Sequence, residues 1–276
     1  MKLAKRISRS STILTHTVAL ITDFGLSDQY VGTLKGVILS INPYVQIVDI
    51  VHTIRPQKIQ QAGYILWTSY RYFPKNTYFL NIVDPGVGTN RKILIMRTKE
   101  YTFLAPDNGL LDFIYQDENI IESIEVIEKM IQPYILKNGS LTFQGRDILA
   151  PLTAHLTKGI RLKEIGIPYS PRKINSTFYT SRSDTTHPCI LNIDHFGNII
   201  TNLSSNKSKQ LLKEMQAISI GRNLVSRWIQ SYEEAPENTP CLIVGSSGLV
   251  EISVKNNSAA QILNVTFDSP IKVYWR

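Results

Sequence analysis

Residues 78–91 read YFLNIVDPGVGTNR, and this stretch decides how the first half of the chain folds. The run 79–83 is mostly apolar and partly β-branched, which predicts a buried strand. That strand ends at Asp84, because Pro85 cannot donate to a sheet ladder and the glycines that follow permit a tight turn. Arg91 lies just beyond the turn, which can fold its guanidinium back towards the Asp84 carboxylate. The alternative is an ordinary structural turn with a surface ion pair, since Asp, Pro and Gly are common turn residues.

The segments around this stretch alternate between strand and helix patterns. Apolar residues at helical spacing predict helices over 30–41, 59–72 and 148–156. Short apolar runs predict strands over 18–22, 45–51, 93–97 and 102–104. The β-α-β-α-β order predicts an α/β N-terminal domain with a mainly parallel sheet.

The amino-acid composition changes between residues 167 and 188, where prolines flank a polar stretch rich in Ser, Thr and Arg. Beyond it, short strands alternate with turns, which predicts a smaller all-β, barrel-like domain. The predicted strands cover 189–193, 199–203, 217–220, 241–244, 249–254 and 271–275. We therefore divide the chain into a basic extension (1–16), an α/β domain (17–170), a linker (171–187) and a β-barrel domain (188–276).

Composition excludes several classes of protein. The chain has 276 residues, of which 43% are hydrophobic, yet no apolar run reaches the length of a membrane span. The net charge of +8 comes from scattered Lys and Arg, so we expect neither nucleic acid nor a membrane as a partner. Cys189 and Cys241 lie far apart, without the spacing of a metal site. They are expected to be reduced thiols in a cytoplasmic protein, and no metal or other cofactor is expected.

Motifs for several other enzymes are absent or misplaced. Asp23-Phe24-Gly25 looks like the magnesium-binding motif of a protein kinase, but too few residues precede it to hold the rest of a kinase. A carboxylate at a strand end of an α/β sheet suits a ribose diol, and Asp23 is such a residue. Asp84, with an arginine in reach, suits either a polar group of a small-molecule ligand or a reacting water.

Six motifs in order extend across both domains: TDFGLSDQYVGTLKGVI from Thr22, VDPGVGTNR from Val83, APDNGLL from Ala105, TFQGRDI from Thr142, IDHFGNIITN from Ile193 and LVEI from Leu249. This set resembles the S-adenosyl-L-methionine hydroxide adenosyltransferase family, whose relatives include the fluorinases and chlorinases. The resemblance implies an α/β catalytic domain followed by a β-barrel substrate-binding domain. It also implies homotrimers, with each active site between two subunits. The implied reaction is attack of water on C5′ of S-adenosylmethionine, giving adenosine and methionine without a metal.

The same resemblance assigns roles to residues. Asp84, Arg91 and Gln144 occupy the positions of the water-activating set, and Thr142 and Phe143 line the pocket for C5′ and the water. Of the remaining substrate-binding positions, Asp23 would hold the ribose hydroxyls and Asp194 the methionine part. The other subunit would contribute the residues that hold adenine and methionine, namely Asn198, Ser246, Glu251 and the backbone near Val254.

Gln144 departs from the family motif T-F-H-G-R-D, in which this position is histidine. A glutamine amide can orient a water but cannot take its proton at neutral pH. This leaves three alternatives to hydrolysis open: a binding protein for S-adenosylmethionine or adenosine with weakened turnover, an interaction protein with an inherited fold, and 5′-halogenation. The last is disfavoured because a carboxylate at Asp84 would repel a halide.

Overall fold

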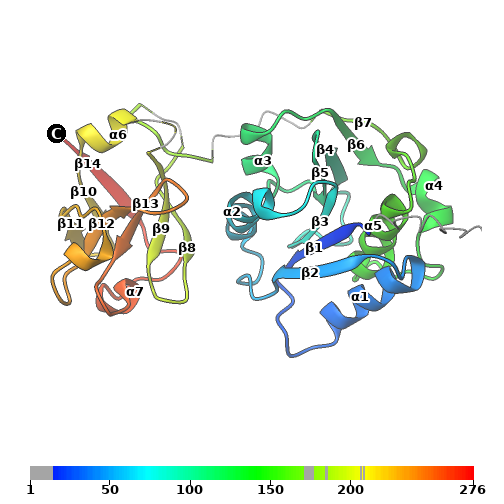
Figure 1. The fold of residues 1–276 in the computed structure, drawn as a ribbon, viewed down its shortest axis with the longest axis horizontal. Coiled ribbons are helices and arrows are strands. Elements are labelled where there is room, and N and C mark those ends of the chain that lie inside the picture. The colour runs from blue at the N-terminus through cyan, green and yellow to red at the C-terminus, as the bar shows by residue number, and fades with distance from the viewer. Residues whose placement is uncertain (1–14, 171–176, 184–185, 206, 208) are drawn as a thin grey trace, which may run out of the picture.

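A seven-stranded sheet forms the centre of the first domain in the computed structural model of the chain, which describes residues 15–170, 177–183, 186–205, 207 and 209–276 (Figure 1). In spatial order its strands are β2 (Gln46–Val51), β1 (Thr17–Thr22), β3 (Thr77–Ile82), β5 (Tyr101–Pro106), β4 (Ile93–Arg97), β6 (Glu122–Val126) and β7 (Gly166–Pro168).

The sheet is parallel on one side and antiparallel on the other. Strands β2, β1, β3 and β5 pair in parallel, as their βαβ order predicts. Strands β4, β6 and β7 extend the sheet by antiparallel pairs. Only residues 98–100 separate β4 from β5, and so short a turn joins antiparallel strands but cannot make a parallel crossover. The predicted α/β class is confirmed, with a mixed sheet.

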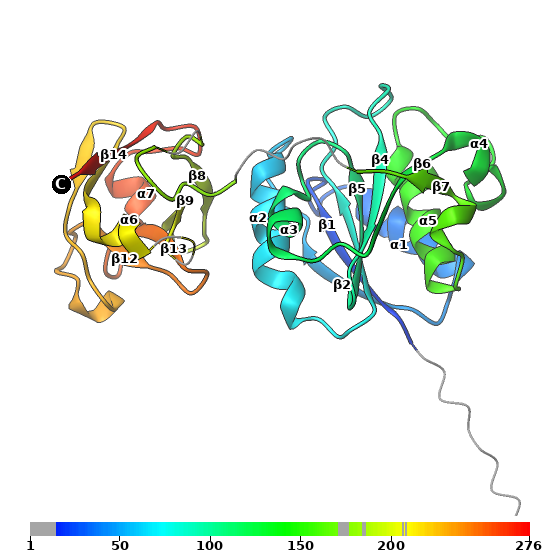
Figure 2. The same cartoon turned by 90° about the horizontal axis from the view of Figure 1, so that it is seen from above.

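Helices cover both faces of this sheet (Figure 2). On one face, apolar residues of α1 (Tyr30–Ile41) and α5 (Ala150–Thr157) pack into one core with β1 and β3. On the other, α2 (Ile59–Ser69) and α3 (Asp112–Asp117) pack into a second core. The remaining short helices of this domain are α4 (Glu128–Ile131), the 3₁₀ turns η1 (Tyr70–Tyr72), η2 (Gln132–Tyr134) and η4 (Leu162–Glu164), and the π-helical turn η3 (Gly145–Leu149).

The second domain has two antiparallel sheets around one core. One contains β12 (Cys241–Val244), β13 (Leu249–Ser253), β9 (Ile199–Ser204) and β8 (Ile190–Ile193), and the other β11 (Asn223–Val225), β10 (Met215–Ile220) and β14 (Ile271–Trp275). The smaller β-rich domain is therefore confirmed. The sequence patterns did not predict its short helices α6 (Lys209–Glu214), η5 (Tyr232–Glu234) and α7 (Ala259–Ile262).

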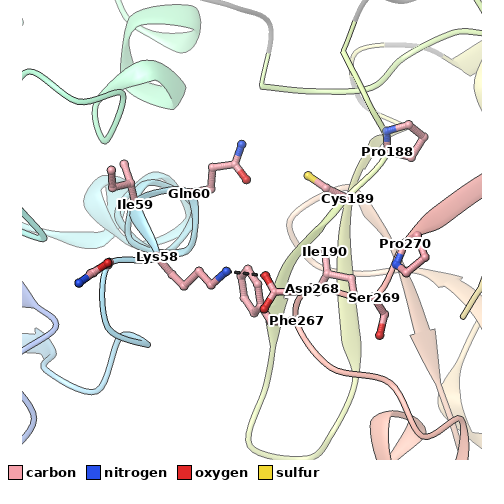
Figure 3. A pocket seen from close by; sticks show the side chains of 11 residues that line it. Lys58, Ile59, Gln60, Pro188, Cys189, Ile190, Phe267, Asp268, Ser269 and Pro270 are labelled. Atoms are coloured by element: carbon pink, nitrogen blue, oxygen red, sulfur yellow. Dashed lines mark hydrogen bonds and ion pairs between the residues drawn. The ribbon is translucent and has the colours of Figure 1, made fainter. Parts of the chain in front are cut away.

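The two domains meet where α2 and α3 face β8 and β9. Six buried side chains form an apolar cluster across this boundary: Tyr64, Phe113, Phe178, Leu191, Ile200 and Leu249. Figure 3 shows the neighbouring cavity of about 440 Å³, where Lys58 at the start of α2 forms an ion pair of 2.5 Å with Asp268. The second domain is thus joined to the first by both apolar and charged contacts.

Parts of the predicted segmentation lie outside the described residues, namely 1–14 of the extension and 171–176 and 184–185 of the linker. Within the described part of the chain, no helix combines the length and the apolar character needed to cross a bilayer. Cys189 and Cys241 are free thiols. Burial raises the pKa of the Cys189 thiol to about 11, which favours the protonated thiol at neutral pH.

Candidate active site

Asp84 and Arg91 meet at the carboxyl end of β3. The intervening turn is closed by backbone bonds from Val87 N–H to the Asp84 carbonyl and from Thr89 N–H to the Gly86 carbonyl. Arg91 Nε donates to both carboxylate oxygens of Asp84 at 2.9 Å, and Nη2 donates to Oδ2 at 2.5 Å. The side chains are only 7% and 11% exposed, so this pair is shielded from bulk water. Such a fork of donors fixes the direction of the carboxylate.

Gln144 completes a three-residue set with this pair. Arg91 Nη2 also donates to Gln144 Oε1 at 2.5 Å. Because a guanidinium has donors and no acceptor, the amide must turn its oxygen towards Arg91. The NH₂ group of Gln144 is thereby turned away from Arg91 Nη2 and can donate to a third molecule.

Aromatic rings connect this set to the end of β1. Phe143 contacts Tyr30 and Phe24 edge to face, with ring centroids 5.3 and 5.7 Å apart. Phe24 follows Asp23, so the loop that carries Gln144 packs on the loop that carries Asp23. Thr142 is exposed, and its hydroxyl pairs with Ser140 Oγ at 2.7 Å.

Asp23 lies at the same edge of the sheet as Asp84. Strands β1 and β3 are parallel neighbours, so the residues that follow them emerge at one edge, where open α/β sheets bind ligands. Asp23 Oδ2 accepts the backbone N–H of Gln57 at 2.9 Å. The structure thus brings Asp23, Asp84, Arg91, Phe143 and Gln144 together on the first domain.

The other predicted residues form a second set on the C-terminal domain. Asp194 and Asn198 close a tight turn, with Asn198 N–H on Asp194 Oδ1 at 2.8 Å and Asn198 Nδ2 on Oδ2 at 2.9 Å. Glu251 is buried on β13 and accepts the Tyr232 hydroxyl at 3.3 Å. Burial, together with the charge of Asp194, raises the pKa of Glu251. Burial also raises the pKa of Tyr232 to about 12, so this hydroxyl stays a donor.

A cavity of about 600 Å³ opens beside this second set. Asn198 and Val254 line it, as do Phe196 and Tyr232, which the sequence patterns did not single out. Phe196 is 75% exposed although it is a large apolar residue. Ser246 is exposed in the turn between β12 and β13.

The two sets are separate within one chain. No hydrogen bond, ion pair or ring contact among the described residues joins them. In Figures 1 and 2, α5, which follows the Gln144 loop, lies on the side of the first domain that points away from β8 and β13. The same described residues contain no group of three His, Cys, Asp or Glu side chains that could hold a metal ion.

Known proteins are similar to this chain over nearly its whole length, across both domains. A protein named (R)-S-adenosyl-L-methionine hydrolase from Methanocaldococcus jannaschii is 32% identical over 269 residues, covering 94% of this chain and 95% of its own length. A fluorinase from Actinoplanes is 30% identical, but over only 67% of this chain and 71% of its own. A crystal structure of an uncharacterized protein from Thermotoga maritima, 30% identical, superposes with a TM-score of 0.80 over 93% of this chain and 100% of that one.

Family models give the same result for each domain separately. Residues 18–166 match the N-terminal domain of the SAM hydroxide adenosyltransferases, and residues 188–272 match their C-terminal domain. The two matches correspond to the two domains described above, in the same order. The chain belongs to the SAM hydroxide adenosyltransferase family.

Proposed function

We propose that this protein hydrolyses S-adenosyl-L-methionine to adenosine and L-methionine. The observation that supports this most directly is the shielded Asp84 carboxylate, held by two guanidinium nitrogens of Arg91 next to a donor amide. The related hydrolase from M. jannaschii is similar over almost its full length, which agrees with this chemistry. The names of that protein and of relatives from Thermus thermophilus and Salinispora arenicola specify the (R) epimer, so we propose that epimer as the preferred substrate.

The reaction follows from the donor and acceptor pattern of the set. A water held in the site donates one proton to Asp84 and accepts a hydrogen bond from Gln144 Nε2, which leaves one lone pair free. That lone pair attacks C5′, the C5′–S bond breaks, and methionine leaves with a neutral sulfur. The water's proton passes to Asp84 and then to solvent. Positioning and a fixed carboxylate supply the catalysis, since the sulfonium is already an activated leaving group. No cofactor enters this scheme.

Water is a better nucleophile for this site than a halide. A halide in the same position would be repelled by the Asp84 charge, by about 4 kcal/mol at about 4 Å with an effective dielectric near 20. This figure is an upper value, because the guanidinium of Arg91, paired with Asp84, offsets part of the carboxylate charge. We therefore propose hydrolysis over halogenation, although fluorinases are among the relatives.

The separation of the two residue sets supports an oligomer in which each active site uses two chains. We propose that the Asp84 set of one copy faces the Asn198 cavity of another, in a homotrimer. The exposed Phe196 beside this cavity is suited to such a contact. A cytoplasmic location is part of the same proposal, and the two free thiols agree with it.

A protein that binds the substrate but turns it over weakly is the second candidate. Gln144 favours it, because its oxygen is occupied by Arg91 and its nitrogen cannot accept a proton. This candidate predicts the same binding with negligible release of adenosine.

Incubation of the purified protein with each epimer of S-adenosylmethionine tests the proposal, with adenosine measured by chromatography. We expect adenosine from the (R) epimer, and its loss in the Asp84→Asn variant. Binding of substrate without adenosine would favour the second candidate. A 5′-halogenated product in the presence of chloride or fluoride would overturn the choice of water.

A further inference from the structure

The loop between β2 and α2 holds the Asp23 turn at two points. His52 at the beginning of this loop accepts the Gly25 N–H at 2.7 Å with its carbonyl oxygen. Gln57 near its end donates its backbone N–H to Asp23 Oδ2 at 2.9 Å. One oxygen of the Asp23 carboxylate is therefore fixed by the backbone of this loop. A ribose diol bound by Asp23 would meet a carboxylate whose orientation the loop has set.

Gln57 adopts a backbone conformation that needs support from its surroundings. Its φ of 67° is in the left-handed region, which residues other than glycine avoid. Such strain persists only where neighbouring contacts over-determine the conformation, and it clusters at functional sites. Lys58 N–H on the Arg55 carbonyl and Ile59 N–H on the Gln57 carbonyl, each at 3.0 Å, close this turn from within.

Gln61 on α2 holds the same turn from outside. Its Oε1 accepts the backbone N–H of Arg55 at 2.9 Å, and its Nε2 donates to Asn192 Oδ1 at 2.8 Å. The side chain is buried, at 7% exposed. The orientation of the amide is unambiguous, because the Arg55 N–H can only donate. Gln61 thus ties the Gln57 turn to β8 of the second domain, two residues before Asp194.

We propose that Gln61 and the left-handed turn at Gln57 position the Asp23 carboxylate for the substrate's ribose. This inference rests on the proposed function, since it takes Asp23 as the ribose ligand. Gln61 does not touch substrate in this scheme and acts through the Arg55–Gln57 turn. Lys58 and Asp268, the ion pair of Figure 3, add a second and more exposed tie between the same turn and the second domain.

Two substitutions at Gln57 test the turn without disturbing a buried group. Gln57 is exposed, and both variants remove the same side chain. Glycine accepts a positive φ, whereas a β-branched valine strongly resists it. We expect Gln57→Val to bind adenosine about tenfold more weakly than Gln57→Gly in calorimetry, as expected for a loosened hydrogen bond to a charged group. Equal affinities for the two variants would overturn the inference.

Variants at Gln61 test the amide itself. Gln61→Met keeps the length of the side chain and removes both hydrogen bonds. Gln61→Glu keeps an acceptor for Arg55 N–H, and Asn192 can turn its amide to donate to the new carboxylate. We expect Gln61→Met to raise KM for S-adenosylmethionine about tenfold with little change in kcat. Gln61→Glu should bind more tightly than Gln61→Met. The exposed neighbour Gln60 gives a matched control, Gln60→Met, which should behave like wild type.

A double variant separates positioning from general stability. Gln57→Gly in the Gln61→Met background should recover affinity, because glycine needs no support to hold the turn. If Gln61→Met lost affinity through a general loss of stability, Gln57→Gly would not restore that affinity. If wild type binds adenosine and Gln61→Met binds it equally well, the inference fails while the proposed function stands. If wild type neither binds adenosine nor releases it from substrate, the proposed function itself fails.

Discussion

At the scale of single residues, Gln144 is where this chain departs from the family motif, which has histidine at this position. The Gln144 amide oxygen accepts from Arg91 Nη2, and in the proposed reaction its NH₂ group donates to the bound water. In that reaction the proton of the water passes to Asp84. This arrangement differs from one with an imidazole at the same position, which could accept a proton near neutral pH. Gln144 therefore makes the proposed hydrolysis depend on a single carboxylate.

Replacing Gln144 by histidine should add a second base to the site. We expect Gln144→His to raise kcat about 10- to 100-fold, which is below the roughly 10²- to 10⁴-fold usual for one general base because Asp84 already accepts the proton in the proposed reaction. The rate should also rise with pH as the imidazole loses its proton, over about pH 6–7. Steady-state kinetics of both proteins over pH 5.5–8.5 would measure this.

Gln144→Glu provides the control, because it changes the charge of the position without placing a group that titrates near pH 6.5. An unchanged kcat in Gln144→His, in a wild type that turns over well, would mean that no base is needed at this position.

The sequence predicted contacts between residues that lie close together along the chain, but not contacts between residues that are far apart. The turn between Asp84 and Arg91 is local, so its residues alone predicted that the two side chains meet. Gln144 lies 53 residues from Arg91, and only family resemblance placed it nearby. Gln57 and Gln61 carry no motif, because their roles depend on backbone conformation and on a buried partner from another domain.

At the scale of elements, the π-helical turn η3 determines how the Gln144 loop joins α5. Pro151 lacks the N–H that an α-helix would donate to the Asp147 carbonyl, and Leu136 N–H occupies that carbonyl instead, at 3.1 Å. The buried Asp147 carboxylate accepts Ser140 N–H at 2.6 Å and Arg146 Nε at 2.6 Å. A single side chain thus connects both ends of the loop that carries Thr142 and Phe143.

Asp147 should therefore contribute to stability in a pH-dependent way. Burial alone would raise its pKa, but the hydrogen bonds from Arg146 and Ser140 outweigh burial and lower the pKa. A lowered carboxyl pKa stabilises the fold above the unfolded-state value of about 4, and this stabilisation is lost as the pH falls through the folded-state value. We expect Asp147→Asn to lose about 1–3 kcal/mol at pH 7, because its amide offers one acceptor oxygen where three N–H donors from Ser140 and Arg146 converge on the carboxylate.

Urea unfolding at pH 7 and at pH 3 measures this prediction. The difference between wild type and Asp147→Asn should narrow at the lower pH. Glu164→Gln, which breaks an exposed pair with Arg161, serves as the control and should change stability much less. A difference that is the same at both pH values would show that the charge of Asp147 is not what holds the loop.

Helices and strands whose apolar residues recur at regular spacing were predicted well. Elements that form only through contacts with distant segments of the chain were not. The predicted bounds of α1, β4, β12 and β14 coincide with the observed ones. Strand β6 was not predicted, because its sequence, Glu122–Val126, has only two apolar residues among three polar ones and becomes a strand by pairing with β4. The π-helical form of η3 was not predicted either, since it arises from Pro151 and from the distant Leu136 N–H.

At the scale of the whole molecule, the order of the two domains followed from composition and strand spacing, whereas their contact did not. The boundary cluster draws single residues from α2, α3, β8, β9 and β13, and none of these segments has a pattern that marks its partner. The separation of the two candidate residue sets is likewise visible only in three dimensions.

This separation gives a prediction about mixed oligomers. Asp84→Ala damages the set on the first domain, and Asp194→Ala damages the set on the second. Each variant alone should be inactive. If every active site uses the first domain of one subunit and the second domain of its neighbour, a random 1:1 mixture restores an intact pair at about a quarter of the sites. Mixing by co-expression or by reversible unfolding, followed by the adenosine assay, should therefore recover about a quarter of wild-type specific activity.

Mixing Asp84→Ala with Arg91→Ala, which damage the same set, should recover none. Failure of the first mixture to recover activity, in oligomers shown by affinity tags to contain both variants, would mean that a single chain supplies both halves of its own site.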